Sequence, residues 1–205
     1  MIQASQLELR AGARLLMSDV NLRVGPGDRV GLVGRNGAGK TTLMKVLAGL
    51  SQPAAGSVIR GEVGYLPQDP ASADGTQSAM ARIMSARGLD AAVTRMQKQA
   101  ARMEDPQHRE QAMRRYASAE AEFLAQGGYA AESEALAVAD GLGLTAEQLL
   151  RPLETLSGGQ RRRVELARIL FGGGEGVLLL DEPTNHLDAD SITWLRGFLR
   201  TYQHG

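Results

Sequence analysis

The sequence predicts an α/β fold with a mainly parallel core sheet and a helical insertion. Residues 177–180 (VLLL) form a wholly apolar run, typical of a parallel strand that is covered on both faces. A glycine-rich loop, residues 34–39, lies between the apolar run 29–33 and a helical pattern over 40–50. Residues 78–137 are dominated by strong helix formers. Strands, helices and a helical insertion are therefore expected in one domain covering 1–205.

Composition limits the classes of protein to which the chain can belong. It has 205 residues, 43% of them hydrophobic, with 23 Lys plus Arg against 23 Asp plus Glu, so net charge indicates no bulk attraction to nucleic acid or membrane. The absence of cysteine excludes disulfides and thiolate metal sites. No apolar run approaches the roughly 20 residues of a membrane helix. We expect no direct membrane insertion and a cytoplasmic location.

Periodicity predicts the elements of the first third. Alternating apolar residues predict two half-buried strands near Leu7–Leu9 and Val20–Val24. The run 29–33 (RVGLV) predicts a buried strand, and 58–66 predicts a hairpin broken at its glycines. One face of the helix over 40–50 is apolar, with Leu43, Val46, Leu47 and Leu50.

The middle segment, 78–137, is expected to be a helical insertion. Pro106 predicts a break between two helices, and Gly127-Gly128 an end to the second. A further helix is expected over 131–142, and the helix over 164–171 has an apolar face. Residues 138–205 then return to α/β structure.

The loop 34–41 (GRNGAGKT) matches the phosphate-binding pattern G-x-x-x-x-G-K-[ST] between a strand and a helix. Glycines allow backbone N–H groups to approach phosphate oxygens, and the helix directs its positive end toward them. Lys40 is expected on the β- and γ-phosphates of a nucleotide, and the Thr41 hydroxyl on Mg²⁺. The predicted nucleotide-binding set is Gly34, Arg35, Asn36, Gly37, Ala38, Gly39, Lys40, Thr41 and Thr42.

Two acids follow the apolar strand 177–180, at the edge of the sheet where α/β proteins bind ligands. Asp181 is expected to hold Mg²⁺, directly or through water. Glu182 is placed to orient and deprotonate an attacking water. An acidic pair at the end of a strand is weak evidence alone and becomes strong beside the phosphate-binding loop.

Residues 156–160 (LSGGQ) predict a second helix N-terminus suited to phosphate. Ser157 is a natural N-cap before a helix from Gln160 onward, and Gly158 and Gly159 leave backbone N–H groups exposed. Alone, the segment would be an ordinary capped helix start.

The three motifs, in this order, resemble the ATP-binding cassette (ABC) family over nearly the whole chain. The resemblance implies a P-loop NTPase fold with an N-terminal antiparallel β subdomain, a mainly parallel core sheet and a helical subdomain carrying an arm-like insertion, and it implies hydrolysis of ATP to ADP and phosphate. The resemblance implies that Gln68 lies in the Q-loop and contacts Mg²⁺ and the attacking water. It places 185–188 (NHLD) in the D-loop, with Asp188 in the site. Two cassettes pair head to tail in this family, so Ser157, Gly158, Gly159 and Gln160 would face nucleotide held by the partner cassette. ATP and Mg²⁺ are the implied ligands.

Within that family, 181–188 (DEPTNHLD) and 160–168 (QRRRVELAR) are similar to the ABC-F group of soluble tandem cassettes that act on ribosomes. The helical insertion corresponds to that group's arm, which contacts ribosomal RNA and protein. The span 82–115 holds eight Arg or Lys against four Asp or Glu, a sign suited to RNA, although a solvated helix face explains it equally well. The alternative is the nucleotide-binding subunit of a membrane transporter. A housekeeping translation factor and an antibiotic-resistance factor both remain open.

The chain departs from the family pattern at two places. No aromatic residue precedes Tyr65, whereas the family stacks one on adenine; Arg10 or Arg14 is able to stack instead, which leaves selectivity for ATP over GTP open. The chain stops at His204-Gly205, before the family's switch histidine. We expect the first part of a two-cassette protein, with the second cassette, or a second copy, as partner.

Overall fold

The computed structural model describes residues 1–67, 75–173 and 176–205. The chain divides into two compact units, each described separately below. Unit 1 comprises Met1–Pro70, Gly173–Asn185 and Arg196–Gly205, and unit 2 comprises Ala71–Gly172 and His186–Leu195.

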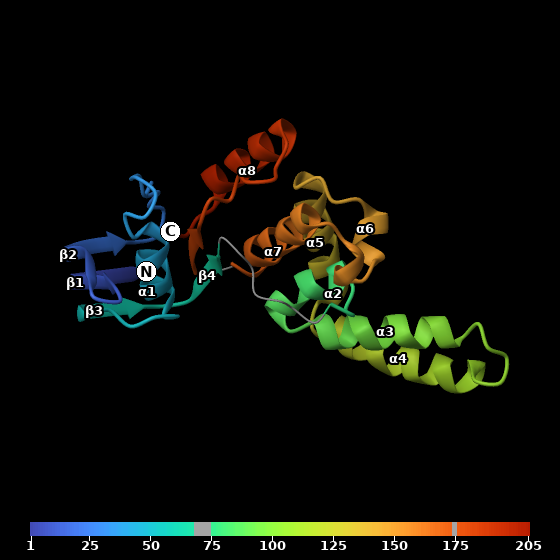
Figure 1. Cartoon of the computed structure of the whole chain (residues 1–205). Coiled ribbons are helices and arrows are strands. Elements are labelled where there is room, and N and C mark those ends of the chain that lie inside the picture. The colour runs from blue at the N-terminus through green and yellow to red at the C-terminus, as the bar shows by residue number, and fades with distance from the viewer. Residues whose placement is uncertain (68–74, 174–175) are drawn as a thin grey trace. The chain divides into compact units, whose positions relative to one another are not determined.

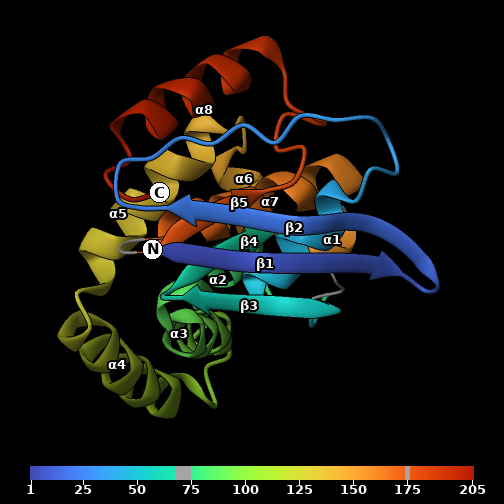
Figure 2. The same cartoon turned by 90° about the vertical axis from the view of Figure 1, so that its left-hand side faces the viewer.

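The described residues of unit 1 form two sheets and one complete helix. β1 (Ile2–Ala11) lies between β2 (Arg14–Val24) and β3 (Ala55–Arg60), antiparallel to both (Figure 2). β4 (Val63–Leu66) pairs parallel with β5 (Val177–Leu180). The two amino-terminal strands and the parallel strand 177–180 are confirmed. The hairpin expected over 58–66 is wrong, because β3 pairs with β1 whereas β4 pairs with β5.

The buried face of β1 changes phase within the strand, so Ile2 and Ala4, then Leu7 and Leu9, are buried. The pairing register shifts at this point, and Gln6 has a φ of 50°. These apolar residues form one core with helix α1 (Lys40–Ala48) and β5. α1 contributes Leu43, Val46 and Leu47 to this core. The expected buried Leu50 is wrong: Gly49 ends the helix with a φ of 78°, and Leu50 is 67% exposed.

The strand expected over 29–33 is also wrong. These residues have no strand assignment, and Val33 is 94% exposed. Next to β5, Leu178 N donates to the carbonyl of Gly205, and the Arg29 side chain is bonded to the carbonyls of Leu199, Tyr202 and His204. A parallel strand is stable only when neighbouring strands pair with its backbone N–H and C=O groups. None of the described strands pairs with residues 29–33, so their apolar character is insufficient to make them a strand.

Unit 2 is helical (Figure 1). Its elements are α2 (Ala79–Met84), a 3₁₀ turn η1 (Ser85–Arg87), α3 (Asp90–Arg102), α4 (Arg109–Ala125), α5 (Gly128–Gly141), α6 (Ala146–Leu150), η2 (Leu153–Thr155), α7 (Gly158–Gly172) and the start of α8 (Ala189–Thr201). The helical middle segment, its break near Pro106 and its break at Gly127-Gly128 are confirmed. The structure adds a break that was not predicted, at Gly88, where the φ is 73°.

The antiparallel pair α3–turn–α4, here called the helical hairpin (residues 90–125), extends from the other helices of this unit (Figure 1). Its base is packed closely: a Cβ at Gly128 would lie 2.4 Å from the ring of Phe123, which is 1% exposed. The phenol of Tyr129 meets that ring edge-on and donates to Glu120. The hairpin therefore begins from a tightly filled junction.

The core of unit 2 lies around α7, where Val164, Leu166 and Phe171 are almost fully buried. The α7 residue Glu165 is 7% exposed and accepts hydrogen bonds from Arg82 of α2 and Arg168. Charge-assisted bonds of this kind compensate for burial of the carboxylate. They also fasten α2 to α7.

Candidate nucleotide-binding site

In unit 1, the glycine-rich loop leads directly into α1. Gly39 is the N-cap of this helix with a φ of 98°, and no side chain caps the helix. A Cβ at Gly39 would lie 3.2 Å from the Cβ of Leu16, so glycine suits both the conformation and the close approach of β2. The amino end of α1 therefore carries backbone N–H groups and the positive end of its dipole without a side-chain acceptor.

The Lys40 ammonium lies against the loop that precedes it. Its Nζ donates to the carbonyls of Gly34, at 2.7 Å, and Arg35, at 3.0 Å. These bonds use two of the three ammonium donors and hold the charge over the loop. The cation is consequently positioned where the loop's backbone N–H groups would meet a phosphate.

Asp181 follows β5 directly, and its backbone N–H donates to the carbonyl of Leu66, which continues the pairing with β4. The carboxylate is 5% exposed and accepts a hydrogen bond of 2.7 Å from Thr41 Oγ1. Burial raises the pKa of Tyr65, and the negative charge of Asp181 raises it further. The hydroxyl of Thr41 and the carboxylate of Asp181, 140 residues apart in sequence, thus meet at one point.

This oxygen pair fits a magnesium ion. Mg²⁺ prefers oxygen ligands, and it commonly takes only one or two protein ligands while waters and phosphate oxygens complete its shell. Thr41 and Asp181 supply one hydroxyl and one carboxylate. The expected third ligand, Gln68, lies outside the residues that the structure describes.

Glu182 has a left-handed backbone, with a φ of 49°. Such a conformation costs an L-residue about 1–3 kcal/mol and persists where neighbours hold it. Asn185 does so twice: its backbone N–H donates to the carbonyl of Glu182 at 3.2 Å, and its Nδ2 donates to the carboxylate at 2.7 Å. This contact was not predicted, although the three-residue spacing of Glu182 and Asn185 in a turn would have suggested it.

The glycine-rich loop, the start of α1, the strand-end acids and residues of β1 and β2 line an open pocket of about 490 Å³. It is lined by Ala11, Arg14, Leu16, Asn36, Gly37, Gly39, Lys40, Thr41, Thr42, Asp181 and Glu182. Leu16 was not expected there. Of the two arginines considered for stacking on a base, Arg14 lines the pocket, whereas Arg10 Nε donates to Glu8 at 2.6 Å. The structure therefore favours Arg14.

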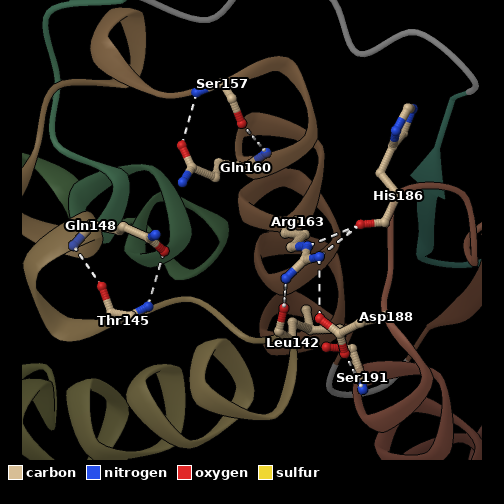
Figure 3. Close-up of polar contacts among 9 residues, drawn as sticks. All are labelled: Leu142, Thr145, Gln148, Ser157, Gln160, Arg163, His186, Asp188 and Ser191. Atoms are coloured by element: carbon tan, nitrogen blue, oxygen red, sulfur yellow. Dashed lines mark hydrogen bonds and ion pairs between the residues drawn. The ribbon is translucent and has the colours of Figure 1, made fainter.

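In unit 2, the segment 156–160 forms a reciprocally capped helix start. The backbone N–H of Ser157 donates to Gln160 Oε1 at 2.8 Å, and the backbone N–H of Gln160 donates to Ser157 Oγ at 3.2 Å (Figure 3). Ser157 and Gly158 are exposed, and a Cβ at Gly159 would lie 3.5 Å from the Cβ of His186. The predicted N-cap is confirmed, and the D-loop lies beside it.

Asp188 of the D-loop caps α8, because its Oδ1 accepts from the backbone N–H of Ser191 at 2.9 Å. Hydrogen bonds from the backbone and side chain of Ser191 lower the pKa of the Asp188 carboxyl, and the nearby Arg163 charge lowers it further. Asp188 is therefore ionised at neutral pH.

Comparison with known proteins identifies relatives of the whole chain. The chain is 38% identical over 207 residues to the tylosin resistance ATP-binding protein TlrC of Streptomyces fradiae, covering 96% of this chain and 38% of TlrC. It is 36% identical over 200 residues to the energy-dependent translational throttle protein EttA of Haemophilus influenzae, covering 93% and 34%. The chain thus spans little more than a third of these relatives.

Among solved structures, the dimeric ATP-binding cassette MJ0796 bound to ADP and Pi matches with a TM-score of 0.62 and 18% identity, covering 97% of this chain and 81% of that chain. At this identity the match shows the fold alone, a P-loop cassette. No helix in the described ranges is long and apolar enough to cross a membrane. A model of the ABC transporter family matches residues 17–185, a range that contains the glycine-rich loop, LSGGQ and the two strand-end acids. The chain belongs to the ABC transporter family, as an ATP-binding cassette that resembles the ABC-F group.

Proposed function

We propose that this cassette binds ATP with Mg²⁺ and hydrolyses the γ-phosphate, paired with a second cassette, in a protein that acts on the ribosome. One observation carries the nucleotide part. Lys40, Thr41, Asp181 and Glu182, from two distant parts of the sequence, line the same pocket of about 490 Å³. That set provides a cation for phosphate, an oxygen pair for Mg²⁺ and a carboxylate for water.

Each residue has a distinct task in this mechanism. Lys40 and the N-terminus of α1 would bind the β- and γ-phosphates, and Thr41 and Asp181 would hold Mg²⁺, which would supply positive charge beside the phosphate oxygens. The Glu182 carboxylate accepts a proton from the water that attacks the γ-phosphorus, and the bond from that phosphorus to ADP breaks. Asn185 orients the carboxylate through its hydrogen bond of 2.7 Å.

The second phosphate-binding motif, residues 156–160, supports a paired arrangement. Ser157, Gly158 and Gly159 would contact the γ-phosphate held by the partner cassette, as the family resemblance implies. The dimeric cassette MJ0796 supports pairing. Gln68 of the Q-loop and Asp188 of the D-loop would complete the nucleotide site between the two cassettes. The helical hairpin belongs to the proposed helical insertion, residues 78–137.

The ribosome part is supported by EttA, a relative named for throttling translation, and by TlrC, named for resistance to tylosin. The hairpin supports it only weakly. Before the hairpin, Arg82 of α2 forms an ion pair with Glu165 and Arg87 of η1 forms one with Glu134. Within the hairpin, Arg95 pairs with Glu122 and Arg114 pairs with Glu110. The exposed basic side chains of the hairpin without an ion pair to any described residue are Lys98, Arg102, Arg109 and Arg115, and Arg109 Nε donates to the carbonyl of Met103. An RNA contact would therefore use this small set.

The decisive experiment is ribosome co-sedimentation of the complete natural protein carrying Glu182→Gln, with ATP and with ADP. Removal of the general base should slow ATP turnover by about 10²–10⁴. The ATP-bound protein should accumulate on ribosomes, more than with ADP and more than the control Glu147→Gln, an exposed residue of α6. Turnover near the wild-type value would contradict the role of Glu182. Slow turnover with recovery in the membrane fraction would favour a transporter subunit.

A further inference from the structure

The Arg163 side chain lies among three segments of unit 2 (Figure 3). Its Nε and Nη2 donate to the carbonyl of His186, at 3.1 and 2.9 Å, and Nη1 donates to that of Leu142, at 3.3 Å. Nη2 also lies 3.3 Å from the Asp188 carboxylate. The side chain is 20% exposed. One guanidinium thus joins α7, the end of α5 and the D-loop.

The surroundings accommodate this guanidinium closely. Leu142 is the C-cap of α5, so its carbonyl belongs to the negative end of a helix, where a cation is favoured. Gly143 follows with a φ of 72°, and a Cβ there would lie 2.8 Å from Arg163 Nη1. Any larger residue at 143 would be strained and would displace the side chain.

The D-loop backbone is itself strained where Arg163 holds it. His186 has a φ of 67°, uncommon for a residue with a side chain. Its carbonyl accepts two guanidinium N–H groups, and two residues later Asp188 is fastened to the first turn of α8 through Ser191. Strained backbone persists only where its neighbours over-determine it. Arg163 is one of those neighbours.

The segment so held lies against the LSGGQ segment. A Cβ at Gly159 would lie 3.5 Å from the Cβ of His186, and Ser157 and Gln160 cap the same helix start. Arg163 follows Gln160 by less than one helical turn, on the helix that this segment begins. The LSGGQ segment and the D-loop therefore form one surface of unit 2.

We propose that Arg163 is a positioning residue that fixes the D-loop to the LSGGQ segment, so that both approach the partner cassette's nucleotide as one body. The inference rests on the proposed paired function. It concerns the site completed by the partner, and not the pocket around Lys40 in this chain. Arg163 should therefore govern turnover and leave ATP affinity at Lys40 unchanged.

The test compares Arg163→Lys with Arg161→Lys in the complete natural protein. Both changes preserve charge on α7, and Arg161 is exposed. Lysine cannot donate to the two carbonyls in the same fixed geometry. ATP binding is measured by calorimetry and kcat by steady-state ATPase assay. Melting curves report stability, and the kinetics are recorded well below the melting temperature of each variant. Hydrogen exchange reports the backbone of residues 186–188.

Arg163→Lys should lower kcat about tenfold, with ATP Kd changed by less than about twofold and exchange accelerated at 186–188. Arg161→Lys should match wild type. Gly143→Ala should lower kcat similarly, and the double variant should be no slower than the slower single variant, because both changes act on one contact. Wild-type kcat in Arg163→Lys, or additive losses in the double variant, would overturn the inference. Undetectable wild-type hydrolysis would instead contradict the proposed function.

Discussion

Two helices of this cassette begin with motifs for phosphate, and they begin differently. α1 starts at Gly39, in a left-handed conformation, without a side-chain cap. α7 starts with Ser157 and Gln160 capping each other's backbone N–H groups. The first helix start leaves donors for a ligand, whereas the second satisfies part of its donors within the chain.

The difference indicates a division of labour. An uncapped helix start is a cost that a bound anion offsets, which suits the primary phosphate site. A self-capped helix start has part of its backbone N–H groups satisfied without nucleotide, which suits the proposed contact with a phosphate held by a partner cassette. Substitutions at the two helix starts should therefore have different effects. At α1 they should lower the affinity for ATP, and at α7 they should lower stability and ATP turnover.

The largest effect is expected at α1. Lys40→Ala should raise the Kd for ATP by about 10²–10⁴, since charge-assisted hydrogen bonds contribute about 1.5–3 kcal/mol each and the ammonium is expected to make two. Calorimetry measures this. The control is Lys45→Ala, in the last turn of the same helix and exposed, which should bind ATP as wild type does. Equal affinity in all three proteins would mean that the loop is only a turn.

At α7, two substitutions of Ser157 separate capping from phosphate contact. Ser157→Ala should lower the free energy of unfolding by about 0.5–2 kcal/mol, the worth of an N-cap. Ser157→Asp should retain the cap and the stability, yet lower ATP turnover by about 10–100-fold, since its carboxylate would face the partner's γ-phosphate. Melting curves and ATPase assays distinguish the two. Full activity in Ser157→Asp would contradict a phosphate contact.

A smaller effect on nucleotide affinity is expected from Arg14, the residue proposed to stack on the purine base. Arg14→Ala should weaken ATP and GTP alike, by about 2–10-fold, because a stacked guanidinium tolerates either purine. The control is Arg10→Ala, which removes a side chain bonded to Glu8 outside the pocket. A wild-type preference for ATP above about 100-fold, roughly 2.7 kcal/mol, would mean that a residue other than Arg14 reads the base.

The smallest effect on ATP affinity is expected from deletion of the helical hairpin, which is remote in sequence from the glycine-rich loop 34–41 and from LSGGQ. Deleting residues 88–126 should change the Kd for ATP by less than about twofold and weaken ribosome binding at one fixed salt concentration. Co-sedimentation compares it with Lys98→Ala and Arg115→Ala. Equal ribosome binding with and without the hairpin would exclude it as the contact.

The sequence predicted local chemistry better than pairing. The motif spacing led to Lys40, Thr41, Asp181 and Glu182, since each motif carries its own strand or helix context. The strand over 29–33 failed because hydropathy reports burial preference and does not report whether a neighbouring strand accepts the hydrogen bonds. Arg163 was not foreseen for a related reason: its partners are backbone carbonyls of Leu142 and His186, and any residue type supplies a carbonyl.

The closely packed junction at Gly128 has a consequence for how such hairpins diversify. Because Phe123 leaves no room for a side chain there, change at the base is suppressed, whereas the turn at 103–108 is exposed over most of its length. Seven residues added to each helix beside that turn would lengthen the hairpin by about 10 Å and keep its facing sides in register. The fold thus allows the length of the hairpin to change at its turn while the packing at its base is kept.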